Sequence, residues 1–175
     1  KRWLEKTPKN IDHYNLIREV WPQSKFILSI RDLRDVFASW KAKAGSNLKN
    51  YNVSEFVTLC KNSFSDYEKL FNTQSKSYID IKYEDTVLNT KETLIRIYDY
   101  LDEVWVEGTQ FHKPSGELAK VKRIIGKGST TSESLEKPIF NTSINQWEKI
   151  LTKEEIKIIE NELGLYQSLM GYPLD

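Results

Sequence analysis

The sequence contains a single cysteine, and its positive and negative charges almost cancel. Cys60 alone cannot form an internal disulfide framework, and this favours a reducing compartment, so we expect a cytoplasmic protein. With 26 Lys and Arg against 25 Asp and Glu, the formal net charge is only +1. This balance gives no bulk electrostatic reason to expect nucleic acid or a membrane surface as a partner, and any basic site must be local.

Long hydrophobic runs and metal-ligand patterns are absent as well. No apolar run reaches the roughly 18 residues that a transmembrane helix needs, and we expect no signal peptide. The two histidines, His13 and His112, lie far from Cys60 and from each other, which excludes a cysteine–histidine zinc pattern. We therefore expect neither a membrane span nor a metal.

Short apolar segments alternate with amphipathic stretches along the chain, as is typical of α/β proteins. The patterns predict strands at 2–5, 26–30 and 78–83, and helices at 10–20, 34–43, 54–71, 91–101 and 152–164. The last helix begins with a capping box, Thr152 with Glu155, and is expected to close at Gly164. Strands that alternate with helices predict parallel βαβ units with right-handed crossovers.

The length of 175 residues and the hydrophobic content of 39% fit one domain with a sizeable core. Between Glu107 and Pro138 the periodicity disappears, and Gly, Ser, Thr and Lys dominate. We therefore expect a single domain over residues 1–175, with a loop or lid over 107–138 that covers a site.

The most informative stretch is KFILSIRDLRDVFASW, residues 25–40. An apolar strand ends in Arg31, and a charged turn leads into a helix that carries Ser39. Anionic ligands bind at this edge of open α/β sheets, and the planar fork of Arg31 suits phosphate oxygens. Arg31 and Ser39 are therefore predicted to contact the same anion. The alternative is a solvated charge cluster, in which Asp32 or Asp35 caps or balances the helix and Arg34 is structural.

Four blocks of sequence, in order, carry a family resemblance. They are RWLEKTPKN, followed by WPQSKFI and RDLRDVFAS; IKYEDTVLNTKETLIRIYDYLD; TSINQWEKILTKEEIKIIE; and MGYP. Together they resemble the sulfotransferase superfamily, whose members use 3′-phosphoadenosine 5′-phosphosulfate as sulfuryl donor. The EKTP strand is similar to the branch that contains glycan sulfotransferases and many bacterial ones.

The resemblance implies an α/β fold in which a parallel sheet is flanked by helices, similar to nucleotide kinases in its core. Sulfotransferases hold the 5′-phosphosulfate in a Ser/Thr/Gly-rich loop that precedes the EKTP strand, and no stretch here matches that loop. We therefore expect this chain to be the C-terminal portion of a sulfotransferase domain that lacks its first βα unit.

By the same resemblance, Glu5 is the general base and Lys6 contacts the sulfuryl group or the acceptor. The residues alone equally allow a surface ion pair beside a turn. His13 is a rival base, because an imidazole titrates in the right range, and His112, in the loop expected over 107–138, could equally reach a substrate.

The donor contacts follow from the family in the same way. Arg31 and Ser39 match the pair that holds the 3′-phosphate, and Tyr83 matches a tyrosine near the adenine, although it could simply pack a strand end. The Arg-Lys-Gly triplet of many members is replaced here by residues 140–142. The missing clamp is predicted to come from loop cations, namely Arg123, Lys127 or Lys137.

The resemblance thus implies transfer of a sulfuryl group to an acceptor hydroxyl or amine, without metal, releasing adenosine 3′,5′-bisphosphate. The acceptor is a small molecule, a glycan or a carrier-bound group. The alternative is a non-catalytic module that binds 3′-phosphoadenosine or keeps only the fold. An ATP-using kinase is disfavoured, because the sequence contains no GxxxxGK[ST] loop.

Overall fold

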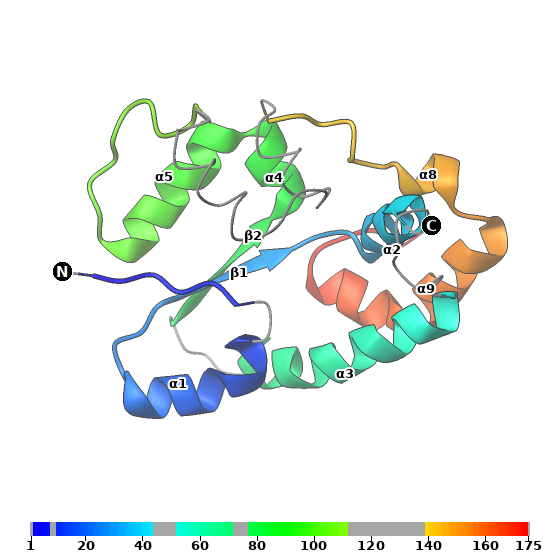
Figure 1. Cartoon of the computed structure of the whole chain (residues 1–175), viewed down its shortest axis with the longest axis horizontal. Coiled ribbons are helices and arrows are strands. Elements are labelled where there is room, and N and C mark those ends of the chain that lie inside the picture. Colours follow the sequence, from blue (N-terminus) through cyan, green and yellow to red (C-terminus); the bar gives the residue numbers. More distant parts are fainter. Residues whose placement is uncertain (1, 8–9, 44–51, 72–76, 112–138, 175) are drawn as a thin grey trace. The chain divides into compact units, whose positions relative to one another are not determined.

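The computed structural model describes residues 2–7, 10–43, 52–71, 77–111 and 139–174 (Figure 1). These residues form an α/β structure with a two-stranded parallel sheet, which confirms the predicted fold class. The chain divides into two compact units: unit 1 contains residues 1–80 and 145–175, and unit 2 contains residues 81–144.

The first described segment of unit 1, residues 2–7, is not a strand, and the strand predicted at 2–5 is wrong. Trp3 and Leu4 are 69% and 86% exposed. An apolar pattern forms a strand only beside a neighbour that shares its backbone hydrogen bonds, and the described sheet consists of two other strands. Trp3 packs instead edge-on against Trp21, with ring centroids 5.5 Å apart.

The helix predicted at 10–20 is confirmed as a short 3-10 helix, η1 (Asn10–His13), that continues into α1 (Tyr14–Val20). It ends before Pro22, as expected from the restricted backbone of a residue that precedes proline. Tyr14 anchors α1 to the sheet, because its ring lies 4.7 Å from that of Phe26 and its hydroxyl is hydrogen-bonded to Ser77 Oγ at 2.7 Å.

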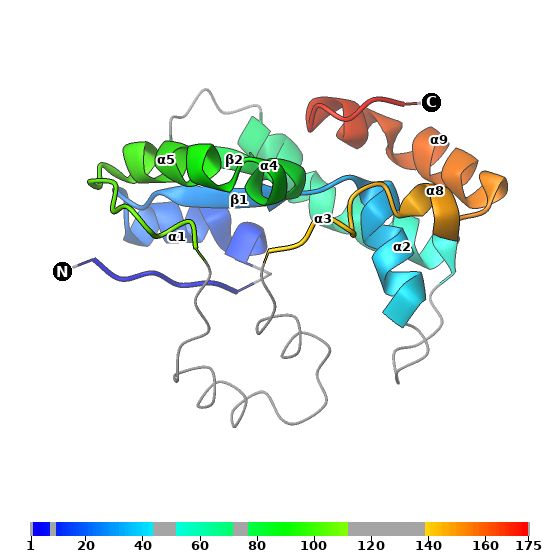
Figure 2. The same ribbon diagram turned by 90° about the horizontal axis from the view of Figure 1, so that it is seen from above.

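The sheet pairs β1 (Phe26–Ile30) with β2 (Tyr78–Lys82), as the apolar segments predict. The helices α2 (Leu33–Lys43) and α3 (Val53–Phe71) are also confirmed. Two further helices of unit 1 follow later in the chain, α8 (Trp147–Ile150) and α9 (Lys153–Leu169). Figure 2 shows α2, α8 and α9 gathered beyond the carboxyl end of β1.

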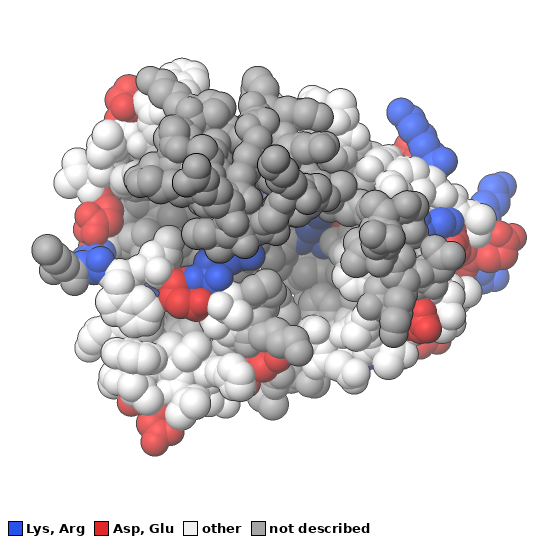
Figure 3. Space-filling view, viewed as in Figure 1, with Lys and Arg blue, Asp and Glu red and all other residues white. Residues whose placement is uncertain are grey.

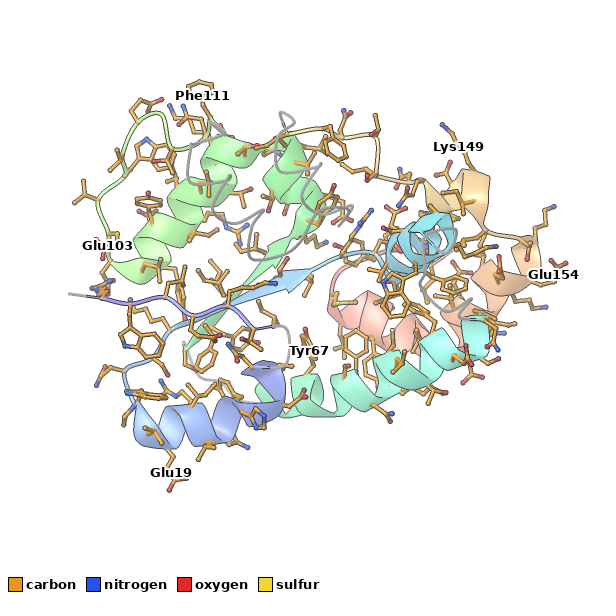
Figure 4. The ribbon with its side chains drawn as sticks, viewed as in Figure 1. Glu19, Tyr67, Glu103, Phe111, Lys149 and Glu154 are labelled. Atoms are coloured by element: carbon orange, nitrogen blue, oxygen red, sulfur yellow. The ribbon has the colours of Figure 1, made fainter. Side chains whose placement is uncertain are left out.

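The core of unit 1 lies between α2, α3 and α9. Phe37, Phe56, Ile159 and Leu163 are at most 1% exposed, and the rings of Phe37 and Phe56 lie 5.0 Å apart. Exposed polar side chains of α8 and α9 point away from this core, as Figure 4 shows for Lys149 and Glu154. On the face drawn in Figure 3, basic and acidic side chains lie next to one another, in keeping with the small net charge.

The capping box that opens α9 is confirmed, since Thr152 and Glu155 each accept a hydrogen bond from the other's backbone N–H. The predicted end at Gly164 is wrong, because α9 continues to Leu169. Gly164 is buried where the chain packs closely: a Cβ there would lie 3.1 Å from Leu174 Cδ1. The helix is terminated by Gly171 at φ 74°, where a left-handed backbone is needed.

Unit 2 contains α4 (Tyr83–Leu88) and α5 (Thr90–Leu101). The sequence predicts α5 but not α4, and it assigns Tyr83 to a strand that ends at Lys82. Thr93, which is 2% exposed, links the two helices through a hydrogen bond from its hydroxyl to the Asp85 carbonyl at 3.0 Å.

Two further predictions concern the loop over 107–138 and the absence of a membrane span. Of the loop predicted over 107–138, only residues 107–111 belong to the described part of the chain. Among the helices of the described residues, none combines the length and the apolar character of a membrane span.

Candidate functional site

The candidate site is the turn between β1 and α2. Arg31 directly follows the last residue of β1, and Asp32 is the N-cap of α2. The Asp32 Oδ1 atom accepts a hydrogen bond from the backbone N–H of Arg34 at 2.8 Å, and the Asp32 carbonyl accepts the first helical bond, from Val36 at 3.0 Å. The predicted sequence of strand, capped turn and helix is therefore confirmed.

Arg34 is structural, as the alternative interpretation of the charge cluster predicts. It is 2% exposed, and its guanidinium donates to Asp32 at 2.9 Å, to Glu160 at 2.8 Å and to the Pro173 carbonyl at 3.2 Å. It also lies 4.1 Å from the ring centroid of Trp147, in a cation–π arrangement. Trp147 is 8% exposed, which indicates a structural role for it as well.

Gln167 is a member of this site that the sequence analysis missed. It is fully buried on α9. Its Oε1 accepts the backbone N–H of Leu33 at 3.0 Å, and its Nε2 donates to Asp32 Oδ1 at 3.0 Å. A residue 134 positions away thus caps α2, and no local sequence signal marks it.

Asp35 is fully buried in the first turn of α2. Its Oδ2 accepts the backbone N–H of Asn145 at 2.9 Å, and its Oδ1 accepts that of Trp147 at 3.1 Å. Burial raises the pKa of the Asp35 carboxyl, while these two hydrogen bonds and the nearby Arg31 act in the opposite direction. Asn145 has a left-handed backbone, with φ 55°, which turns its N–H toward Asp35.

Arg31 and Ser39 lie four residues before and four residues after Asp35. The Arg31 Nη2 atom lies 3.9 Å from Asp35 Oδ2, and the Arg31 side chain keeps 20% of its surface exposed. Ser39 is half-buried and lies one turn beyond Asp35 on α2, so Asp35 and Ser39 share a helix face. Both candidates belong to unit 1.

Glu5 and Lys6 lie in the exposed segment before η1. The Glu5 carboxylate accepts hydrogen bonds from the Thr7 hydroxyl and from the Asn10 side-chain amide, both in its own local segment. These bonds, that from Thr7 first, lower the pKa of Glu5. The carboxylate is therefore ionised at neutral pH and able to accept a proton.

The remaining candidates are spread over the chain. His13 ends η1 and is exposed. Tyr83 is half-buried at the first position of α4, directly after β2. Four other candidates lie outside the described residues: His112, Arg123, Lys127 and Lys137. Among the residues that the structure describes, no three His, Cys, Asp or Glu side chains are grouped as metal ligands.

Comparison with known proteins identifies a family over the larger part of the chain. A family model described as "Sulfotransferase family" matches residues 1–107. The matched region contains Glu5, Lys6, Arg31, Ser39 and Tyr83. A search of curated proteins found no matching sequence.

Proposed function

Because this chain belongs to the sulfotransferase family, we propose that it transfers a sulfuryl group from 3′-phosphoadenosine 5′-phosphosulfate to an acceptor hydroxyl or amine. The observation that carries the proposal is the β1–α2 turn, where Arg31 pairs with Asp35 and Ser39 lies one helical turn beyond Asp35. A guanidinium and a hydroxyl at the carboxyl end of a strand suit the donor's 3′-phosphate.

Side chains rather than the helix terminus hold the phosphate in this proposal. Two N–H groups at the start of α2, those of Leu33 and Arg34, already donate to Gln167 and Asp32. These two N–H groups are therefore not available to the 3′-phosphate of the nucleotide, although a helix N-terminus often binds anions through such groups. Arg31, with part of its side chain exposed, is the cation that reaches the ligand.

Glu5 serves as the general base and Lys6 as the contact to the sulfuryl group. As the acceptor oxygen or nitrogen forms its bond to sulfur, its proton passes to the Glu5 carboxylate. The bond from sulfur to the 5′-phosphate oxygen breaks, and adenosine 3′,5′-bisphosphate leaves with that electron pair. Substrate that displaces the Thr7 and Asn10 hydrogen bonds would raise the pKa of Glu5 toward the range of a working base.

The rest of the proposal concerns adenine, acceptor and compartment. Tyr83 is half-buried at the end of β2, where a ring suits a stacking or edge contact with adenine. The acceptor is a small molecule, a glycan or a carrier-bound group. The single cysteine favours the cytoplasm.

Calorimetric titration with adenosine 3′,5′-bisphosphate tests the donor site. We expect the wild-type protein to bind, and Arg31→Ala to bind about 10- to 100-fold more weakly, because charge-assisted hydrogen bonds contribute about 1.5–3 kcal/mol. Arg96→Ala is the matched control, since Arg96 is an exposed arginine of α5, and its affinity should equal that of the wild type. A wild-type protein that does not bind the nucleotide contradicts the proposal.

A second candidate function, a module that binds 3′-phosphoadenosine without catalysis, is favoured by one observation. Glu5 is exposed, and its hydrogen bonds lower its pKa, so in this state it is a weak base. Glu5→Gln separates the two functions. A catalyst keeps nucleotide affinity in this variant but loses transfer to a panel of hydroxyl and amine acceptors. A binding module shows no transfer in either protein.

A further inference from the structure

The Asp35 carboxylate joins two parts of unit 1 that are far apart in sequence. Its two oxygens accept the backbone N–H groups of Asn145 and Trp147, at 2.9 and 3.1 Å. The oxygen that binds Asn145, Oδ2, is also the one that lies 3.9 Å from Arg31 Nη2. The same atom therefore faces the 145–147 turn on one side and the Arg31 guanidinium on the other.

This arrangement leaves Asp35 little freedom to move. The side chain is fully buried, and a buried carboxylate is costly unless hydrogen bonds or opposite charge compensate it. Two N–H donors and one guanidinium supply that compensation. The left-handed backbone at Asn145 aims one of these N–H groups at the carboxylate, so the turn is shaped around it.

We propose that Asp35 is a positioning residue that orients the Arg31 guanidinium for an anionic ligand by anchoring it to the Asn145–Trp147 turn. The inference rests on the proposed function, in which Arg31 binds the donor's 3′-phosphate. It goes beyond that function, because it assigns to a buried acidic residue a favourable effect on the binding of an anion. Asp35 itself does not touch the ligand.

A purely electrostatic role and an orienting role of Asp35 predict opposite effects of its substitution on phosphate binding, which makes the inference testable. If Asp35 acted only as a nearby negative charge, its removal would make the site more positive and would tighten phosphate binding. If it orients Arg31, loss of the carboxylate removes the ion pair with the guanidinium, and an asparagine amide, which has a single oxygen, can accept only one of the two N–H groups as before. Phosphate binding then weakens in spite of the gain in positive charge.

The experiment compares adenosine 3′,5′-bisphosphate with adenosine 5′-phosphate, which lacks the 3′-phosphate, by calorimetry. For Asp35→Asn we expect roughly tenfold weaker binding of the bisphosphate and little change for the monophosphate. Asp35→Glu keeps the charge but moves the carboxylate by one methylene, so it should show the same selective loss. Glu160→Gln is the control, because it also removes a carboxylate from the buried cluster but contacts Arg34.

A second readout does not need the nucleotide. In Asp35→Asn, amide hydrogen exchange should accelerate at Asn145 or Trp147, because the asparagine side chain keeps one of the two oxygen acceptors, whereas Glu160→Gln should leave both amides as protected as in the wild type. This measurement also shows whether each variant is folded. If Asp35→Asn does not fold, Asp35→Glu decides the question.

Each outcome has one meaning. Equal or tighter bisphosphate binding by the folded Asp35 variants overturns the inference and leaves the proposed function intact, provided that Arg31→Ala still weakens binding. Equal losses for both nucleotides also overturn it, because they indicate general damage to the site. A wild-type protein that binds neither nucleotide overturns the proposed function, and the inference with it.

Discussion

Replacing Arg34 by methionine should destabilise unit 1 severely. Arg34 is 2% exposed, and its guanidinium donates to two carboxylates and one carbonyl, those of Asp32, Glu160 and Pro173. Methionine matches much of the length of the side chain but supplies no donor. The variant therefore leaves a buried carboxylate at Asp32 and a partly buried one at Glu160 without their cation.

The size of the effect follows from this uncompensated charge. Removal of one partner from a buried ion pair typically costs about 3–5 kcal/mol. The loss of the cation–π contact with Trp147 adds to that cost, because the ring lies only 4.1 Å from the guanidinium carbon. A domain is stable by about 5–15 kcal/mol in total, so the Arg34→Met protein should lose a large part of its stability.

Urea denaturation followed by circular dichroism measures this loss. With a slope of about 2 kcal/mol per molar urea, the midpoint should fall by roughly 2 M. Lys157→Met is the matched control, because Lys157 is an exposed cation of α9, and its midpoint should change by less than about 0.3 M. If the two variants unfold at similar urea concentrations, the buried ion pairs of Arg34 do not stabilise the fold and the argument is refuted.

Two further predictions concern single sites of the helices. Gly164→Ala should stabilise the protein by about 0.5 kcal/mol, because it removes a glycine from the middle of α9. The atom nearest to the added Cβ belongs to Leu174, whose 46% exposed side chain can move aside. A lower urea midpoint would contradict this prediction. Burial raises the pKa of the Cys60 thiol to about 12. Alkylation of Cys60 by iodoacetamide at pH 8 should therefore be about a thousandfold slower than alkylation of free cysteine, and equal rates would contradict this prediction.

Local signals account for the parts of the fold that the sequence predicts well. The strand at 26–30, the turn at Asp32 and the capping box at Thr152 each depend on residues within a few positions of one another. Their hydrogen bonds join neighbours in the chain, so the sequence pattern carries the geometry. Local chemistry alone allows two interpretations of Arg31 and Ser39, an anion site and a solvated charge cluster. The family resemblance favours the anion site.

Contacts between residues far apart in the sequence explain the predictions that were wrong. The segment at 2–5 has an apolar pattern, but a strand also needs a neighbour, which no local pattern supplies. Gly164 resembles a helix end, yet it is there because the chain near Leu174 packs closely against α9. The distant partners of α2 were equally hidden, since Gln167 and Asn145 lie more than a hundred residues from the groups they bind.

The partners of the β1–α2 turn lie beyond the region that identifies the family. The family match covers residues 1–107, which include Arg31, but the groups that hold the turn belong to 145–173. Asn145 and Trp147 bind Asp35, Gln167 binds Asp32 and the backbone of Leu33, and Glu160 binds Arg34.

A polypeptide restricted to the matched residues would retain Arg31 but lose every one of these partners. It would also expose the buried charges of Asp35 and Arg34 without several of the groups that compensate them, since only Arg31 and Asp32 would remain. The residues that identify the family are therefore not sufficient to hold the β1–α2 turn. In this chain the turn that carries Arg31, the proposed contact of the 3′-phosphate, is held by carboxylate, amide and backbone groups that residues 145–173 supply.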